Sequence, residues 1–167
     1  TDSTYTITSS DQGKKIQAVI SYTDGKNNSE EITTSTINVY FQGPSNTTNG
    51  LNADGGVGND LLIGSTNNDT INGQGGDDEI HGGEGNDTLT GDSGNDTIYG
   101  GKGNDSIDGS HSGVNNLFGN DGDDNFDGLN GSNAYGGKGN DYFYGGNTVG
   151  TLDGGEGDDQ FYGVFLN

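Results

Sequence analysis

Between residues 55 and 162, one large apolar residue recurs about every ninth position, and the residues between are nearly all small or polar. The chain divides there into twelve blocks: GGVGNDLLI, GSTNNDTIN, GQGGDDEIH, GGEGNDTLT, GDSGNDTIY, GGKGNDSID, GSHSGVNNLF, GNDGDDNFD, GLNGSNAY, GGKGNDYFY, GGNTVGTLD and GGEGDDQFY. Ten blocks have nine residues, one has ten and one has eight. A core with one inward side chain per repeat needs few apolar residues, so this period predicts a packed, repetitive structure.

Composition excludes some functions and favours others. The hydrophobic content of 25% and the net charge of −21 would ordinarily indicate disorder, but here the glycines and apolar residues keep fixed repeat positions. With 26 acidic residues against 5 basic ones, the chain lacks the positive charge that nucleic acid requires and favours cations as partners. There is no cysteine, and no apolar run is long enough to predict a membrane span.

The first 41 residues follow a different pattern. Segments 4–8, 16–22 and 32–41 are rich in Thr, Ile, Val and Tyr, which predicts three strands. Asp24-Gly25 predicts a turn between the second strand and the third.

This N-terminal region resembles the C-terminal half of bacterial immunoglobulin-like repeats. We therefore expect residues 1–41 to form part of an antiparallel sandwich whose other half lies upstream or in a neighbouring chain. The alternative is a small three-stranded cap that packs on the end of the repeats. Residues 42–54 are a predicted polar linker, and residues 163–167 are a short C-terminal tail.

The blocks match the nonapeptide GGxGxDxUx, in which U is a large aliphatic or aromatic residue, and five blocks keep the first six positions nearly intact. In this they resemble the RTX (repeats-in-toxin) family over about two thirds of the chain. The resemblance implies an all-β fold, a right-handed parallel β-roll that binds calcium and in which two blocks make one full turn.

The chemistry of the repeat agrees with this expectation. Glycines allow a turn backbone to adopt positive φ and direct carbonyl oxygens at one place, and the sixth-position Asp adds a carboxylate. Such hard oxygen ligands suit Ca²⁺, which takes six to eight oxygens, whereas zinc prefers His and Cys. Each ion is implied to lie between two stacked turns and to take oxygens from both. The implied ligands are Asp60, Asp69, Asp78, Asp87, Asp96, Asp105, Asp124, Asp141, Asp159, Gly55, Gly73, Gly82, Gly91, Gly100, Gly119, Gly136 and Gly154.

Stacking of alternate blocks sorts the sixth positions into two edges. The even edge carries Asp69, Asp87, Asp105, Asp124, Asp141 and Asp159 without a break. The odd edge carries Asp60, Asp78 and Asp96, followed by Asn115, Asn133 and Gly150. Counting stacked Asp pairs predicts about five calcium ions on the even edge and about two on the odd edge, about seven in all. The glycine-poor turn 64–69 should weaken the first even site, and Asn115 and Asn133 leave room for a weak third odd site.

Position eight predicts the core and position nine the outer face. The odd sheet should bury Leu62, Ile80, Ile98, Leu117, Ala134 and Leu152, and the even sheet Ile71, Leu89, Ile107, Phe126, Phe143 and Phe161. On the outer face of the odd sheet, Tyr99, Phe118 and Tyr135 follow one another. They are either ordinary cross-strand packing or a docking surface for a neighbouring domain, another copy of the chain or a glycan.

The residues predict no catalytic constellation, since the two histidines lie in no metalloprotease motif and the carboxylates belong to the calcium edges. We expect a calcium-binding, non-enzymatic β-roll that folds outside the cell, within a secreted or surface adhesin of a bacterium. The alternatives are the C-terminal folding module of a type I-secreted enzyme and a subunit of a surface layer or filament.

Overall fold

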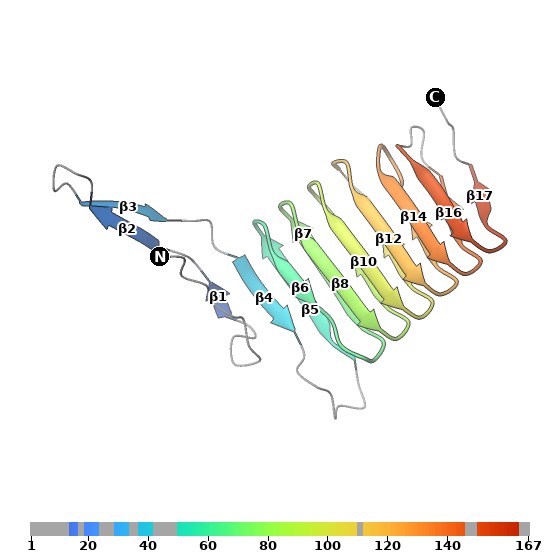
Figure 1. Ribbon diagram of the computed structural model, residues 1–167, viewed down its shortest axis with the longest axis horizontal. Coiled ribbons are helices and arrows are strands. Elements are labelled where there is room, and N and C mark those ends of the chain that lie inside the picture. The colour runs from blue at the N-terminus through green and yellow to red at the C-terminus, as the bar shows by residue number, and fades with distance from the viewer. Residues whose placement is uncertain are drawn as a thin grey trace.

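The computed structural model describes residues 50–109, 112–145 and 150–163 in full. It also gives the backbone of four earlier strands: β1 (Lys14–Ile16), β2 (Val19–Thr23), β3 (Ser29–Thr33) and β4 (Ile37–Phe41). The described residues contain strands and turns but no helix, so no described segment is a long apolar helix that could cross a membrane. The repeats form a parallel β-solenoid of about six coils, as the sequence predicts (Figure 1).

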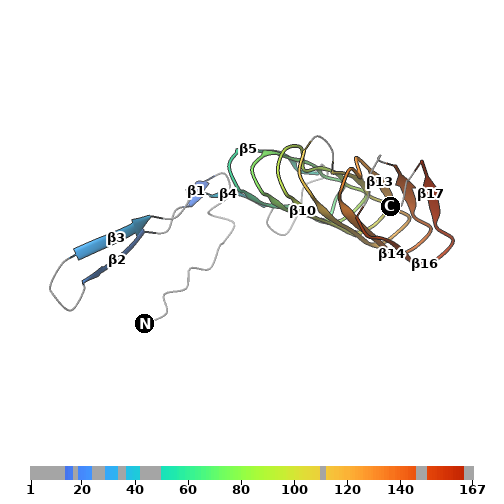
Figure 2. The ribbon, with the colours of Figure 1, turned by 90° about the horizontal axis from the view of Figure 1, so that it is seen from above.

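Each coil contributes one strand to each of two sheets. The odd sheet contains β6 (Leu61–Ile63), β8 (Glu79–Glu84), β10 (Thr97–Lys102), β12 (Asn116–Asp121), β14 (Asn133–Lys138) and β16 (Leu152–Glu156). The even sheet contains β5 (Asn52–Val57), β7 (Thr70–Gly75), β9 (Thr88–Thr90), β11 (Ser106–Asp108), β13 (Asn125–Asp127), β15 (Tyr142–Tyr144) and β17 (Gln160–Tyr162). Figure 2 shows the chain passing back and forth between the two sheets around a flattened coil.

The strand register confirms that alternate blocks stack. In the odd sheet Ile98 pairs with Ile80 on one side and with Leu117 on the other, all three at position eight. Equivalent residues lie 18 apart in regular coils, and 19 or 17 apart where the ten-residue or the eight-residue block intervenes. The two irregular blocks therefore change the length of one turn each without shifting the inward positions.

From β8 onward, the strands of the odd sheet have five or six residues. The ladder of β10 with β8 continues past position nine, so that Lys102 pairs with Glu84. The Lys102 ammonium lies 2.6 Å from the Glu84 carboxylate, and the same contact recurs between Lys138 and Asp121 at 2.7 Å. Charges of opposite sign thus face each other across neighbouring strands, which favours the correct register although each exposed pair contributes little free energy.

The core matches the predicted positions, with corrections at its ends. Eleven side chains form one cluster that is 0–1% exposed: Leu62, Ile71, Ile80, Leu89, Ile98, Ile107, Leu117, Phe126, Leu129, Ala134 and Phe143. Phe161 stacks on Phe143 with ring centroids 4.7 Å apart, but it is 44% exposed because β17 is the last strand of its sheet. Leu152 is only partly buried. Leu129, in the eight-residue block, is a core residue that the period did not predict, because it occupies no regular inward position.

The aromatic residues on the odd face stack on one another. Tyr99 lies 5.0 Å from Phe118, and Phe118 lies 5.0 Å from Tyr135, with nearly parallel rings. His81 extends the stack, 4.7 Å from Tyr99. Because these ring faces cover each other, the geometry favours cross-strand stiffening of the sheet over a platform on which a sugar ring would stack.

The described N-terminal strands overlap two of the three predicted ones. β2 and β3 pair antiparallel, Thr23 with Ser29, across the position of the predicted Asp24-Gly25 turn. Most of the predicted strands 16–22 and 32–41 falls within these four strands, whereas the predicted strand 4–8 lies outside the described residues.

Two further strands connect the N-terminal region with the roll. β1 pairs antiparallel with β4, and β4 pairs in parallel with β6, so both extend the odd sheet. This arrangement is compatible with the alternative of a cap, and both the cap and the immunoglobulin-like half-sandwich remain predictions. The roll also begins earlier than expected: β5 starts at Asn52 inside the predicted linker, and Ala53 is buried at the inward position.

Candidate metal centre

The sixth position of the repeat places a buried carboxylate at most of the turns. Eight aspartates are 0–4% exposed: Asp60, Asp69, Asp78, Asp87, Asp96, Asp105, Asp124 and Asp141. From Asp69 onward, one carboxylate oxygen of each accepts the backbone N–H of the equivalent residue in the preceding coil, as in Asp87 N–H to Asp105 Oδ1 and Asp105 N–H to Asp124 Oδ1, both 2.8 Å. Asp159, in the last coil, accepts in the same way from Asp141 and is partly buried. The predicted aspartates therefore form two continuous rows that hold the coils in register.

In six of these carboxylates the second oxygen has no hydrogen-bond partner. This is true of Oδ2 in Asp78, Asp87, Asp96, Asp105, Asp124 and Asp141, each of which is shielded from solvent. A buried charge without a partner costs several kilocalories per mole, so native proteins neutralise such groups with a counter-charge or a proton. The row of Oδ2 atoms therefore requires positive charge.

Burial raises the pKa of these carboxyls above the usual 3.8. The pKa rises to about 7 for Asp78, Asp87 and Asp124 and to about 6 for Asp105. Neighbouring carboxylates raise the pKa of Asp78 further, and the hydrogen bond from the Asp60 N–H lowers it without cancelling the effect of burial. Near neutral pH each group therefore gains from any cation that binds Oδ2.

Each Oδ2 faces a small space beside the first glycine of its own block. A Cβ atom added to Gly82 would lie 2.5 Å from the carbonyl oxygen of Gly100 in the next coil, and closer still to Asp87 Oδ2. The same pair of oxygens, one carboxylate and one carbonyl, converges at Gly64, Gly82, Gly100, Gly119 and Gly136 on the even edge and at Gly55 and Gly73 on the odd edge. We call each such space a cradle. The predicted ligand glycines are all buried, and Gly91 and Gly154 meet the aspartate of their own turn.

The donor set of the cradles fits calcium. Each offers carboxylate and backbone carbonyl oxygens, the hard ligands that Ca²⁺ prefers. Within the described part of the chain, no three His, Cys, Asp or Glu side chains converge as they would around zinc. The fit therefore depends on the main chain as much as on the aspartates, which explains the requirement for glycine at the first position.

A second ladder, which the motif did not predict, runs along position five. The side-chain oxygen of Asn59 accepts the N–H of Asp77 at 2.9 Å, and Asp77 accepts the N–H of Asn95 at 2.9 Å. On the even edge the same bonds link Asn86 with Asn104 and Asn104 with Asp123. The recurrent Asn-Asp pair at positions five and six is the signal in the sequence, and position five links neighbouring coils through its side-chain oxygen.

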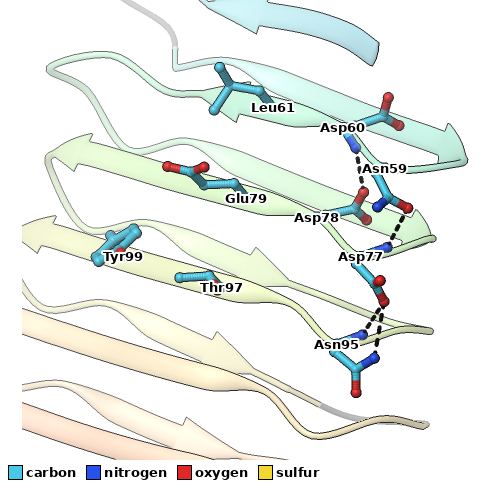
Figure 3. A pocket seen from close by; sticks show the side chains of 9 residues that line it. All are labelled: Asn59, Asp60, Leu61, Asp77, Asp78, Glu79, Asn95, Thr97 and Tyr99. Carbon is cyan, nitrogen blue, oxygen red and sulfur yellow. Dashed lines mark hydrogen bonds between the residues drawn. The ribbon is translucent and has the colours of Figure 1, made fainter. Parts of the chain in front are cut away.

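Figure 3 shows both ladders on the odd edge, where Asp60 N–H donates to Asp78 and the chain of bonds runs from Asn59 to Asn95. The shallow pocket drawn there opens on the outer side of this edge between Asn59 and Tyr99. Its lining residues are members of the two ladders and neighbouring strand residues, and they include no His, Cys, Ser or Lys.

The turn at 64–69 differs from the others, as the sequence predicts. Ser65 donates its backbone N–H to Asp69 Oδ2 at 2.5 Å and its hydroxyl to Asp69 Oδ1 at 3.0 Å. Leu51 N–H also donates to Asp69 Oδ1. Since the carboxylate of Asp69 is already hydrogen-bonded within its own turn, it has less need of a cation than the other members of the even edge.

The second half of the odd edge requires a correction. The division of the sequence into blocks assigned Asn133 to the sixth position. In the structure Asn133 pairs with Asn116, which is one residue after the sixth-position Asn115. Ser132 occupies the position instead: it is fully buried, and its hydroxyl accepts the N–H of Asn115 at 3.1 Å. The eight-residue block lacks one residue of the turn, and only the strand pairing reveals on which side the gap falls. Asn133 instead donates to Asn116 Oδ1 at 3.0 Å and accepts from Thr151.

The chain matches the family model of the RTX calcium-binding nonapeptide repeat in four segments, 54–89, 81–110, 133–149 and 150–164. Together they cover just over half of the chain and most of the roll. Neither a curated protein nor a solved structure matches the chain.

Proposed function

Because the chain belongs to the family of RTX calcium-binding nonapeptide repeats and is a Ca²⁺-binding β-roll module, we propose that it orders on binding Ca²⁺ outside the cell, as part of a secreted or surface adhesin. RTX rolls are structural calcium-binding modules rather than catalytic ones. The function of this chain is then to supply a calcium-dependent rigid segment.

The observation that carries the proposal is the row of buried Oδ2 atoms without partners. Calcium held in the cradles would supply the missing positive charge. Its ligands would be the sixth-position aspartates together with the first-position glycine carbonyls that the resemblance implies. Without cations, carboxylates one strand spacing apart repel each other, and the thin core cannot compensate. The binding free energy of calcium thereby becomes folding free energy.

The cradles support the predicted count of about seven ions, five on the even edge and two on the odd edge. The bonds from Ser65 to Asp69 make the first even site the weakest. About seven ions contribute about +14 of charge against the −21 of the chain, which relieves most of its self-repulsion.

The extracellular assignment is supported by the family, whose repeats occur in secreted bacterial proteins. Cells keep calcium low inside and meet it at high concentration outside, and extracellular modules bind it with Kd values on the order of 10⁻⁴–10⁻³ M. A roll that remains unfolded in the cell and orders after export follows from such affinities. The adhesin role depends on the resemblance of the N-terminal region to immunoglobulin-like repeats. Many such repeats in the parent sequence would support it, whereas one catalytic domain would favour the folding module of an enzyme.

Isothermal titration with Ca²⁺, combined with far-ultraviolet circular dichroism, tests the calcium-dependent fold. We expect about seven ions per chain, and a sheet signal that is absent in EDTA, appears with Ca²⁺ and does not appear with equimolar Mg²⁺, which prefers a smaller, rigid octahedral site. A sheet signal that persists in EDTA would contradict coupled folding.

A further inference from the structure

The row of carboxylates on the odd edge ends at Asp96, and the next sixth position is Asn115. This side chain is fully buried, as the aspartates are. Its oxygen Oδ1 accepts the N–H of Asp96 at 2.7 Å, the same bond that an aspartate makes at the preceding levels of this edge. Asn115 therefore keeps the ladder intact but brings no negative charge.

The other half of the amide differs from a carboxylate. Asn115 Nδ2 donates to the carbonyl oxygen of Gly109, the first residue of its own block. In an aspartate turn the equivalent first-position carbonyl faces the cradle of the preceding coil, as Gly91 O does, 2.9 Å from a Cβ added at Gly73. The Gly109 carbonyl that would complete the cradle at Gly91 is thus already bound. At Gly91 itself the three nearest atoms all belong to Asp96.

We propose that the Asn115 amide takes the place of a calcium ion, and that the odd edge is closed by neutral hydrogen bonds, without metal, from Asn115 onward. An amide N–H carries partial positive charge and satisfies the carbonyl that a cation would otherwise bind. The next level of the odd edge is neutral as well, because the Ser132 hydroxyl accepts the N–H of Asn115 and carries no negative charge to attract a cation. This inference rests on the proposed function and refines it: the C-terminal half of the roll binds calcium on the even edge only.

The extra core residue supports the same division. Leu129 is fully buried in the block that follows, at the part of the odd edge that has lost its carboxylates. Burial of a leucine side chain contributes free energy that does not depend on calcium. The C-terminal half of the roll thus combines metal-dependent closure on the even edge with metal-independent closure on the odd edge.

Asn115→Asp tests the inference by restoring the motif. The change is nearly isosteric, keeps Oδ1, removes the N–H that holds Gly109 and supplies an Oδ2 beside it. We expect the variant to bind one more calcium ion per chain than the wild type, counted by titration and independently by elemental analysis after equilibrium dialysis. The matched control is Asn95→Asp, which adds the same charge on the same edge at exposed position five, where Asp77 already stands. This control should bind the wild-type number.

Asn115→Ala provides a second measurement that does not require a new site. If the amide replaces the ion, the variant binds the wild-type number of ions but melts at a lower temperature in saturating Ca²⁺, because Gly109 loses its donor. If Asn115 is itself a ligand, the variant loses an ion, which would overturn the inference.

The failure of this inference can be told apart from the failure of the proposed function. A wild-type chain that binds no calcium would refute the function. A wild-type chain that binds calcium, with an Asn115→Asp variant that binds no additional ion, would refute the role of Asn115 alone.

Discussion

Filling one cradle with a methyl group should remove one calcium ion, and Gly100→Ala is the sharpest way to do so. Gly100 is buried on the even edge and is not among the glycines with positive φ, so its substitution adds volume without backbone strain. The new Cβ would lie 2.8 Å from Gly119 O and closer still to Asp105 Oδ2, where ordinary van der Waals contact begins at 3.4 Å. The methyl group therefore occupies the space between the two oxygens that would bind the ion.

Two terms set the size of the effect. Forcing a methyl group into a packed site costs about 1–3 kcal/mol. Losing an ion that is present at 100 times its Kd costs about 2.7 kcal/mol more. The free energy of unfolding in saturating Ca²⁺ should therefore fall by about 4–6 kcal/mol, which for a chain of this length lowers Tm by on the order of 10–20 °C.

The assay pairs thermal melting in excess Ca²⁺ with titration of the bound ions. Gly75→Ala is the matched control, because its Cβ would meet only Gly56 O, at 3.9 Å, and Gly75 also lacks a positive φ. The control should keep the wild-type stoichiometry and its unfolding free energy should change by no more than about 0.5 kcal/mol. If Gly100→Ala bound as many ions as the wild type and melted with the control, the cradle would not be the calcium site.

Three further predictions follow from the buried carboxylates and the core. Asp124→Asn should bind at least one calcium ion fewer than the wild type while keeping its hydrogen bond from the Asp105 N–H, whereas the exposed control Asp127→Asn should bind the wild-type number. Equal calcium stoichiometry in the two variants would show that the sixth-position aspartate is not a calcium ligand. In EDTA the sheet signal of the chain should increase as the pH falls. Burial raises the pKa of Asp124 from 3.8 to about 7, so protonation of this group stabilises the folded state fully below about pH 4, and that stability is lost as the pH rises through 7. A metal-free sheet signal that increases with pH would contradict this. Leu129→Ala should lower the free energy of unfolding in urea by about 2–5 kcal/mol in saturating Ca²⁺ without changing the number of bound ions. The control Val57→Ala, at a 94% exposed position, should change the free energy of unfolding by less than about 0.5 kcal/mol. If Leu129→Ala left the free energy of unfolding unchanged, this leucine would not be part of the core.

The period of the repeat was sufficient to predict the main features of the roll. A side chain at position eight faces inward in every regular block, because the strand alternates and the turn that precedes it has constant length. The same regularity placed the aspartates on two edges, and the glycine-poor turn 64–69, which departs from it, predicts that the first even site is the weakest. These features depend on spacing within one block or between neighbouring blocks, and that spacing is explicit in the sequence.

Irregular blocks were less predictable from spacing. The sequence alone could not decide whether Ser132 or Asn133 takes the sixth position of the eight-residue block, since a deletion can be placed on either side of a short motif. Pairing of Asn133 with Asn116 resolves the choice. Leu129 is a core residue for the same reason: it occupies the second position of the shortened block, which is exposed or half-buried in the regular blocks that the structure describes.

The repeat, its inward positions and the carboxylates that favour a cation follow from the sequence alone. What the tertiary structure decided is how residues 17 to 19 apart meet across stacked coils. The position-five ladder, the orphaned Oδ2 atoms and the bond from Asn115 to the Gly109 carbonyl become visible only once the coils are stacked, because hydrogen bonds depend on distance and direction that no one-dimensional pattern records. The odd edge that ends its carboxylates at Asp96 is therefore not a degraded copy of the even edge, but an edge closed by a different chemistry.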